Sequence, residues 1–296
     1  MMPRRTSFEA IGTHWDIQVR DVVAESDWKH LLERVDLRIQ AFDGAYSRFR
    51  PDSLVTQMSR QAGAYNLPPD GYRLLHFYKQ LYEVTSGKVT PLIGQVMADA
   101  GYDAAYSFQP KQLRRPPVWE KALRLNSKTL ILKRPALLDF GAAGKGYLVD
   151  IVSAMLADAG LHNYIINAGG DILSRSKAGE SLSVGLENPF DTSEVVGITR
   201  LVNQSLCASS GSKRKWGKYH HVIDPTLLES TRTIIATWVI ADDTMTADGI
   251  ATALFFTDPA LLRKEFKFSF AVLHEDMALH YSRDFPVQLF EWEYAG

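Results

Sequence analysis

The sequence predicts an α+β fold in which helices come first along the chain and strands follow. Two early stretches, 31–46 and 74–82, repeat apolar residues with helical spacing. Later, residues 182–186 alternate apolar side chains with small or polar ones, and residues 234–240 are rich in β-branched residues. Such a separation of helices from strands favours α+β over a doubly wound parallel sheet.

The remaining elements follow from the same patterns. In chain order, we expect a strand at 15–19, helices at 31–46 and 74–82, a loop at 114–117, a hairpin at 123–132, a strand at 136–138, a helix over 147–156, strands at 164–167, 182–186 and 234–240, and a helix at 247–256. Gly160 stands where a helix C-cap is expected.

The composition is that of a globular protein with a hydrophobic core. Of the 296 residues, 46% are hydrophobic, and the formal net charge is -1. The clustered basic surface typical of nucleic-acid binding is missing, so we expect no nucleic-acid partner. The densest basic segment, 212–218, is interpreted as a solvated loop, with contact to ligand phosphates as the alternative. We expect one domain spanning residues 1–296.

Cysteine usage and the N-terminal residues bear on the compartment. The single cysteine, Cys207, excludes an intrachain disulfide and a cysteine-rich metal site. No apolar stretch follows Arg4 and Arg5, so we expect neither a signal peptide nor a lipid-anchor cysteine. No segment approaches the length of a membrane span. We therefore expect a cytoplasmic protein, or a periplasmic one if an export segment has been removed.

The most informative segment is a glycine-rich turn, 139–147, that leads into a helix. Small residues at a helix N-terminus expose backbone N–H groups, and the helix dipole favours an anion there. Because Asp139 enters the turn and Lys145 leaves it, the segment suits a phosphate-bearing ligand held with a metal ion. It is not a Walker A loop, since Gly146 follows the lysine. Alternatively, the glycines only permit tight packing of the helix on a sheet.

A second candidate site lies on the expected helix at 247–256. Asp248 and Thr252 are four residues apart, so their side chains share one face of that helix. A carboxylate, a hydroxyl and a nearby backbone carbonyl form a hard-oxygen set suited to Mg²⁺ or Ca²⁺. The alternative is structural: Asp248 favours the helix dipole, and Thr252 bonds back to the helix backbone.

Two adjacent histidines, His220 and His221, stand before a turn at Asp224 and Pro225. A histidine here could accept a proton from a nucleophile. Adjacent residues of a strand point in opposite directions, so one of the two at most serves a single site. The alternative is that both hydrogen-bond to loop backbone. Residues 209–211 are interpreted as a turn or a phosphate-facing loop rather than a nucleophile.

Taken in order, these segments resemble the FAD:protein FMN transferase (ApbE) family from residue 11 to residue 256. Residues 139–150 resemble the family's D-L-G-G-I-A-K-G-Y-A-V-D, and 246–253 resemble T-A-D-A-L-A-T-A. The other matching blocks are M-G-T at 11–13, M-S-x-Y/F-x-x-x-S at 46–53, N-x-G-G-D/E at 167–171, G-I-x-x-P at 185–189 and T-S-G with H-I-I-D-P at 209–211 and 221–225.

The resemblance implies an ApbE-like, T-fold-related mixed or antiparallel sheet with packed helices and FAD in a central cleft between two lobes. It implies an enzyme that binds FAD and Mg²⁺, transfers FMN to a Ser or Thr hydroxyl of a target protein and releases AMP. By position, Asp248 and Thr252 would hold the metal, with the backbone carbonyls of Ala142 and Ala251. His221 is the candidate catalytic base. The residues expected to contact FAD are Ile11, Phe49, Ala100, Gly101, Tyr102, Asp139, Lys145 and Val222.

The sequence departs from the family pattern at a few positions. The family's G-x-F-D-P-T-V-G-P-L has Thr90 in place of its Asp and Leu92 in place of its Thr. The T-G pair after Asp224 and Pro225 is Leu227 and Leu228. These changes bear on flavin orientation and target docking more than on metal binding. Two other functions stay open: hydrolysis of FAD to FMN and AMP by water, and non-catalytic flavin binding.

Overall fold

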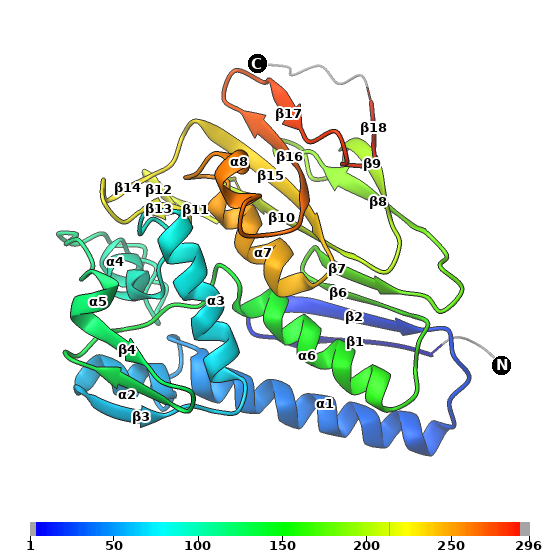
Figure 1. Cartoon of the computed structure of the whole chain (residues 1–296), viewed down its shortest axis with the longest axis horizontal. Coiled ribbons are helices and arrows are strands. Elements are labelled where there is room, and N and C mark those ends of the chain that lie inside the picture. The colour runs from blue at the N-terminus through cyan, green and yellow to red at the C-terminus, as the bar shows by residue number, and fades with distance from the viewer. Residues whose placement is uncertain (1–3, 213, 291–296) are drawn as a thin grey trace.

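The main structural element of the fold is a long antiparallel sheet (Figure 1). The computed structural model describes residues 4–212 and 214–290. All neighbouring strands of the main sheet pair antiparallel. In spatial order its strands are β1 (Arg4–Ala10), β2 (Thr13–Val19), β6 (Tyr164–Ala168), β7 (Asp171–Arg175), β10 (Ser205–Ser210), β15 (Ile234–Ala241), β16 (Ser269–His274) and β17 (Leu279–Tyr281).

Helices cover one face of this sheet (Figure 1). The helices are α1 (Glu25–Tyr46), α2 (Leu54–Arg60), α3 (Gly71–Val84), α4 (Gly94–Asp99), α5 (Trp119–Ala122), α6 (Gly144–Asp158), α7 (Thr244–Ala253) and α8 (Pro259–Leu262), with a 3₁₀ turn at Pro91–Ile93. Strand residues such as Ile17, Cys207 and Val239 share one core with α1, α3, α6 and α7. Burial of this continuous apolar surface is the main source of stability.

A second sheet packs on the other face of the C-terminal half of the main sheet. It consists of β8 (Leu182–Glu187), β9 (Val195–Leu201) and β18 (Val287–Leu289). Leu206 and Trp238 face this second core, whereas Cys207 and Val239 face the helices. This alternation is the period-two side-chain pattern of strands.

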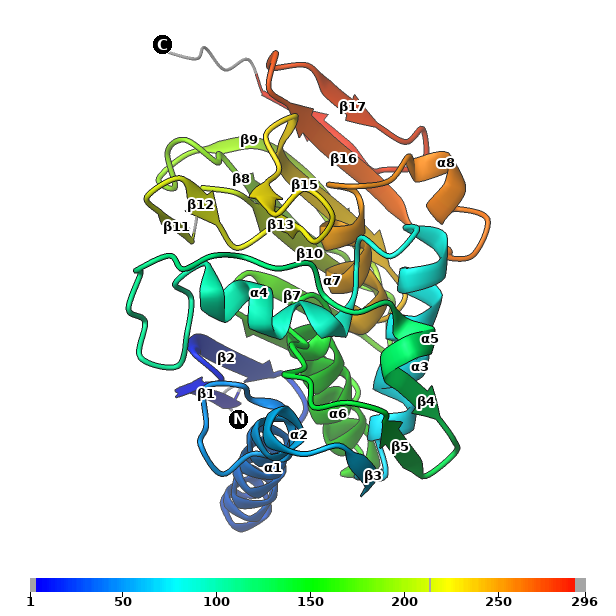
Figure 2. The same cartoon turned by 90° about the vertical axis from the view of Figure 1, so that its left-hand side faces the viewer.

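The early helical part carries its own small sheet, seen at the lower left of Figure 1. Its strands are β3 (Gly63–Asn66), β5 (Thr129–Leu132) and β4 (Leu123–Leu125). Two short ribbons, β11 (Lys215–Trp216) with β12 (Tyr219–His220) and β13 (Ile223–Asp224) with β14 (Glu229–Ser230), lie near α4 in both views (Figure 2). Residues of α4 and of these ribbons share a third core.

The predicted antiparallel α+β class is confirmed, and most predicted elements are present. Residues 136–138 are an exception, because they form no strand. Single backbone bonds hold this segment instead, from Ala136 N–H to Met58 O and from Asp139 N–H to Pro91 O. Helix α7 starts three residues earlier than predicted, because the Asp243 side chain caps it by accepting from Thr246 N–H, and it also ends three residues earlier, at Ala253.

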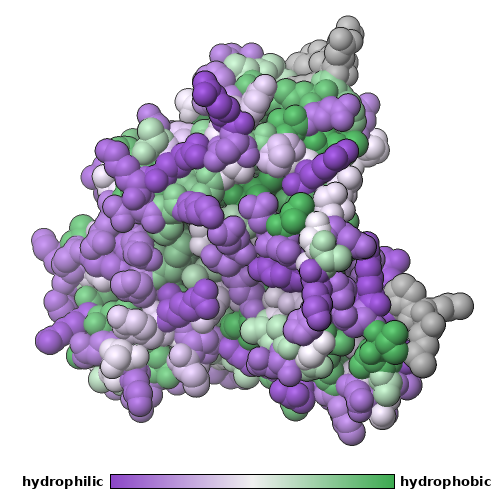
Figure 3. All heavy atoms as spheres, turned by 45° about the vertical axis from the view of Figure 1, so that its right-hand side comes forward, coloured by the Kyte–Doolittle hydropathy of each residue, from purple (hydrophilic) through white to green (hydrophobic). Residues whose placement is uncertain are grey.

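The surface is mainly polar on the face shown in Figure 3, where hydrophilic side chains separate small hydrophobic groups. Within the described ranges, no helix has the length and apolar character needed to cross a bilayer. Among the exposed large hydrophobic residues, Tyr106 and Phe108 also line the cavity described next.

Candidate active site

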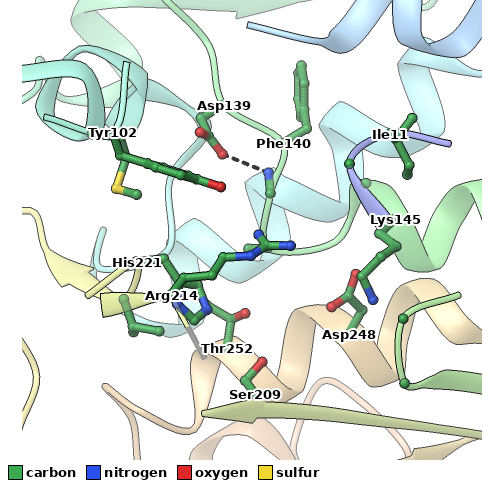
Figure 4. Close-up of a pocket in the computed structure, with 18 of the residues that line it drawn as sticks. Ile11, Tyr102, Asp139, Phe140, Lys145, Ser209, Arg214, His221, Asp248 and Thr252 are labelled. Carbon is green, nitrogen blue, oxygen red and sulfur yellow. Dashed lines mark hydrogen bonds between the residues drawn. The ribbon is translucent and has the colours of Figure 1, made fainter. Parts of the chain in front are cut away.

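The early helical part and the later strands together line a cavity of about 1050 Å³. Its walls include the end of α1, the N-terminus of α6, helix α7, the end of β10 and the segment around β11 and β12 (Figure 4). Ligand sites commonly measure about 300–1,000 Å³, so the cavity can hold a ligand as large as a dinucleotide.

Three N–H groups of the glycine-rich turn donate to oxygens of the protein itself. The N–H of Gly141 donates to Asp139 Oδ1 at 2.7 Å, and those of Ala142 and Ala143 both donate to the Tyr78 hydroxyl at 3.1 Å. The predicted anion cradle is therefore wrong for these residues. What the turn presents is oxygen: no described residue donates a hydrogen bond to the Ala142 carbonyl.

The Ala142 carbonyl accepts no hydrogen bond from the described residues because its usual helical donor, the N–H of Gly146, bonds elsewhere. In a regular helix, the N–H of Gly146 would bond to the carbonyl four residues earlier. Here it donates to Asp248 Oδ2 at 2.9 Å. Gly146 also permits the close approach of α6 and α7, because a Cβ there would lie 2.3 Å from Thr244 O. The glycines were interpreted as permitting tight packing of the helix on a sheet, whereas at Gly146 the close packing is against helix α7.

Helix α7 places two more oxygen ligands in the same cavity. Asp248 and Thr252 both line it, one helical turn apart (Figure 4). Asp248 is 5% exposed, and burial raises the pKa of its carboxyl, while the nearby Lys145 and Arg214 oppose that rise. Within the described residues the Thr252 hydroxyl makes no hydrogen bond, so the predicted backbone bond is not formed.

Ala251, the fourth predicted metal ligand, is placed differently. Its carbonyl accepts a hydrogen bond from Thr237 Oγ1 at 2.7 Å, and the residue is fully buried outside the cavity lining. The residues of the predicted hard-oxygen set that line the cavity are therefore Ala142, Asp248 and Thr252. One carboxylate with two neutral oxygens matches Mg²⁺, which takes few protein ligands and completes its shell with phosphates and water.

Asp139 is held by an arginine that sequence patterns gave no reason to single out. Arg48, only 6% exposed, pairs through Nε with Asp139 and donates through Nη1 to Tyr102 O at 2.6 Å. Its guanidinium lies 4.2 Å from the Phe49 ring centroid and 5.0 Å from that of Tyr102. Arg48 therefore fixes both the carboxylate and the two aromatic residues predicted to contact FAD.

The aromatic residues form one cluster at this end of the cavity. Phe49 stacks on Tyr106 with ring centroids 5.2 Å apart, and Tyr102 stacks on Trp216 at 5.3 Å. Trp216 Nε1 donates to the Ala100 carbonyl at 2.7 Å. Ala100 and Gly101 thus support Tyr102 but do not line the cavity themselves.

Lys145 enters the cavity from the first turn of α6 (Figure 4). Its ammonium group pairs with Asp171, which is 2% exposed. Ile11 and Val222, also predicted to contact FAD, line the cavity as well. Ile11 has a φ of 45°, the left-handed conformation that suits the tight turn between β1 and β2.

The two histidines have different surroundings. His220 hydrogen-bonds through Nε2 to Thr231 O at 2.7 Å and through Nδ1 to Val222 N–H at 3.2 Å, so it is structural. His221 lines the cavity, and its Nδ1 is buried with no partner among the described residues. Burial, with the positive charge of Arg214, lowers the pKa of His221 from 6.5 to about 3. His221 is therefore neutral at physiological pH, and the same surroundings make it a weak base in the protein without a ligand.

The structure also places residues 209–211 and the positions that depart from the family pattern. Ser209 and Ser210 end strand β10, so only Gly211 belongs to the predicted turn. Thr90 lines the cavity and accepts a hydrogen bond from Leu92 N–H at 3.2 Å, while Leu92 is in the core. Leu228 has a φ of 61°, a conformation that the glycine of the family pattern adopts without strain.

Comparison with known proteins identifies the family of this chain. Residues 11–267 match the ApbE family, and the chain belongs to that family. FAD:protein FMN transferase of Vibrio cholerae is 25% identical over 82% of this chain and 78% of its own length. The protein of the same name from Haemophilus influenzae is 26% identical, over 84% and 79%. The resemblance predicted from the ordered motifs is thereby confirmed.

Solved structures agree with the fold. The flavin transferase ApbE from Vibrio cholerae superposes with a TM-score of 0.80 at 20% identity, covering 96% of this chain and 98% of that one. The ApbE protein from Thermotoga maritima gives a TM-score of 0.79, also at 20% identity, over 95% and 97%.

Proposed function

We propose that this chain transfers FMN from FAD to a Ser or Thr hydroxyl of a target protein, with Mg²⁺ as cofactor and AMP as the released product. The observation that carries the proposal is the set of cavity-lining oxygens at Ala142, Asp248 and Thr252, in one cavity with a neutral, buried His221. The names of the relatives state the transfer of FMN from FAD to a protein.

Mg²⁺ held by these oxygens would neutralise charge on the pyrophosphate of FAD. His221 would then accept the proton of the target hydroxyl as its oxygen attacks the FMN phosphorus. The bond between that phosphorus and the oxygen leading to AMP breaks, and AMP leaves with the electron pair. Asp139 and Lys145, with Ile11, Phe49, Tyr102 and Val222, would position FAD for this step.

The two alternative functions, FAD hydrolysis and flavin binding, differ from FMN transfer in the products that the protein releases. Hydrolysis would give AMP and free FMN without a target protein. Simple flavin binding would give neither product, and it offers no reason for a buried carboxylate and a free hydroxyl one turn apart at the cavity. The oxygen set therefore favours pyrophosphate chemistry over flavin binding.

The test is to incubate the protein with FAD, Mg²⁺ and a candidate acceptor protein, and to measure AMP, free FMN and protein-bound flavin. We expect AMP and protein-bound flavin to appear together and only with Mg²⁺. Asp248→Ala should abolish both, while Asp242→Ala, which removes an exposed carboxylate from the same segment, should not. Free FMN in place of bound flavin would establish the hydrolase. FAD binding without AMP would leave a flavin-binding protein.

His221→Ala separates catalysis from binding. Because the proposed role of His221 is proton transfer, the substitution should lower the rate of transfer about 100-fold or more and change FAD affinity little. Single-turnover rates and FAD fluorescence titration give the two quantities. Equal losses in both would show that His221 only binds the substrate.

A further inference from the structure

Several cationic side chains line the cavity, and carboxylates of the protein neutralise most of them. Among the residues that the structure describes, six cationic side chains line the cavity: Arg48, Arg50, Lys88, Lys145, Arg214 and Lys215. Carboxylates pair with the first four of these residues: Asp139 with Arg48, Asp43 and Asp52 with Arg50, Asp224 with Lys88, and Asp171 with Lys145.

Arg214 and Lys215 remain without an ion pair in the described part of the chain. Arg214 directly precedes β11, and Lys215 is its first residue. Trp216, which follows them, is buried and anchored to the Ala100 carbonyl. The ribbon is therefore fixed, and the direction of each side chain is set by its register.

The register places Arg214 opposite His221. Lys215 pairs with His220 and Trp216 with Tyr219 in the antiparallel ribbon. One step further, the His221 N–H donates to the Arg214 carbonyl at 3.1 Å. Residues directly opposite each other in an antiparallel pair carry their side chains on the same face. The Arg214 guanidinium and the His221 ring therefore enter the cavity together.

The close-up view agrees with this placement. The Arg214 side chain extends from the segment that carries His221 toward the space between Asp139, Lys145 and Asp248 (Figure 4). Its charge also acts on the groups around that space, since it lowers the pKa of His221 and opposes the raised pKa of Asp248. A guanidinium with no carboxylate partner among the described residues, between a candidate base and a candidate metal site, is placed for an anionic oxygen.

We propose that Arg214 contacts the phosphoryl group that is transferred and stabilises the negative charge that develops on it. This inference rests on the proposed function. When the acceptor hydroxyl oxygen bonds to the FMN phosphorus and the bond to the AMP oxygen breaks, charge spreads over the non-bridging oxygens. A guanidinium stabilises that charge with two parallel N–H donors. Because the interaction strengthens in the transition state, it should act on kcat more than on FAD affinity.

The test compares Arg214→Ala, Arg214→Lys and Lys218→Ala with the wild type. Lys218 is an exposed cation of the same ribbon that does not line the cavity. We expect Arg214→Ala to lower kcat for transfer about 100-fold or more. FAD affinity should change much less, and added guanidinium ions should restore part of the rate. Arg214→Lys should retain part of it, and Lys218→Ala should behave as the wild type.

The outcomes separate the two proposals. A wild-type protein that releases no AMP and labels no acceptor overturns the proposed function, and this inference with it. A wild type that transfers FMN while Arg214→Ala keeps its kcat overturns the inference alone. Loss of FAD affinity as large as the loss of kcat/KM, with kcat unchanged and no guanidinium rescue, also overturns it. Circular dichroism and Tm identify any variant whose fold has changed.

Discussion

At the scale of single residues, the fold strongly changes the protonation of His221. It is buried in the cavity, next to the positive charge of Arg214 and the second histidine, so its pKa falls from 6.5 to about 3. The unfolded chain therefore binds a proton on this residue below pH 6.5, and the folded chain does not until the pH is near 3. As the pH falls through this window, His221 lowers the stability of the fold by ~1.4 kcal/mol per pH unit.

His221→Gln tests this effect directly, because glutamine is polar and does not titrate. The difference in free energy of unfolding between wild type and variant should be constant above pH 7. Between pH 6 and pH 4 it should shift in favour of the variant, by up to ~1.4 kcal/mol per pH unit. Urea unfolding at several pH values measures it. A difference that does not change with pH would mean that His221 titrates normally in the folded protein.

The residues of the candidate site differ in how far the sequence could predict them. Asp139, Lys145, His221, Asp248 and Thr252 were predictable because they stand in ordered motifs, and all of them line one cavity. Ala251 shows the limit, because the direction of its carbonyl depends on a hydrogen bond from a distant strand. Tyr78 and Arg48 were not singled out. Tyr78 stands in a helical core stripe, and nothing in that pattern shows that its hydroxyl holds the glycine-rich turn.

At the scale of elements, the crossing of α6 and α7 sets the geometry of the oxygen ligands. The two helices approach closely at Gly146, where one N–H serves Asp248 and the Ala142 carbonyl is left free. Asp150 of α6 adds a second link by accepting hydrogen bonds from the N–H groups of Thr244 and Met245, at the start of α7. Packing and the candidate metal site are therefore coupled through one glycine.

Gly146→Ala should weaken both the packing of α6 on α7 and the candidate metal site. Its Cβ would lie 2.3 Å from Thr244 O and 2.8 Å from Asp248 Cβ, so α6 and α7 would have to move apart. We expect a loss of about 1–3 kcal/mol in the free energy of unfolding. The Mg²⁺-dependent rate should fall as well. Chemical denaturation and AMP release measure the two effects.

Gly44→Ala is the matched control, because Gly44 lies in α1 with no heavy atom within 4 Å of its added Cβ. Alanine there should stabilise the protein by about 0.4–1 kcal/mol and leave the Mg²⁺-dependent rate unchanged. If Gly146→Ala were as harmless as this control, the close packing of α6 on α7 would not determine the site.

Prediction of the elements succeeded where the apolar pattern was strong. The stripes at 31–46 and 74–82 became α1 and α3 because their apolar faces are buried in one core. Residues 136–138 are apolar but form no strand, since the segment makes single backbone bonds to helix α2, from Ala136, and to the 3₁₀ turn at Pro91, from Asp139. Strand β1 was missed because it is an edge strand whose side chains are half-buried or exposed along its whole length. The order of strands in the main sheet depends on long-range pairing that no local pattern specifies.

At the scale of the whole molecule, the cavity lies where the early helical part meets the later strands. The turn between β1 and β2, the end of α1, the start of α6 and helix α7 all contribute to its lining, although they are far apart in the sequence. A ligand that fills this cavity contacts both parts of the chain. It should therefore stabilise the fold as a whole rather than one element.

Thermal unfolding with and without ligands tests this coupling. A ligand at 100 times its Kd adds about 2.7 kcal/mol to the free energy of unfolding, which raises Tm measurably. If FAD and the proposed metal ligands share one site, FAD with Mg²⁺ should raise Tm by more than the sum of the two separate shifts. Asp248→Ala should remove this excess and keep the shift caused by FAD alone, while Asp242→Ala should keep both. An excess that persisted in Asp248→Ala would place the metal elsewhere, since the two remaining oxygens, from Ala142 and Thr252, carry no charge to hold it.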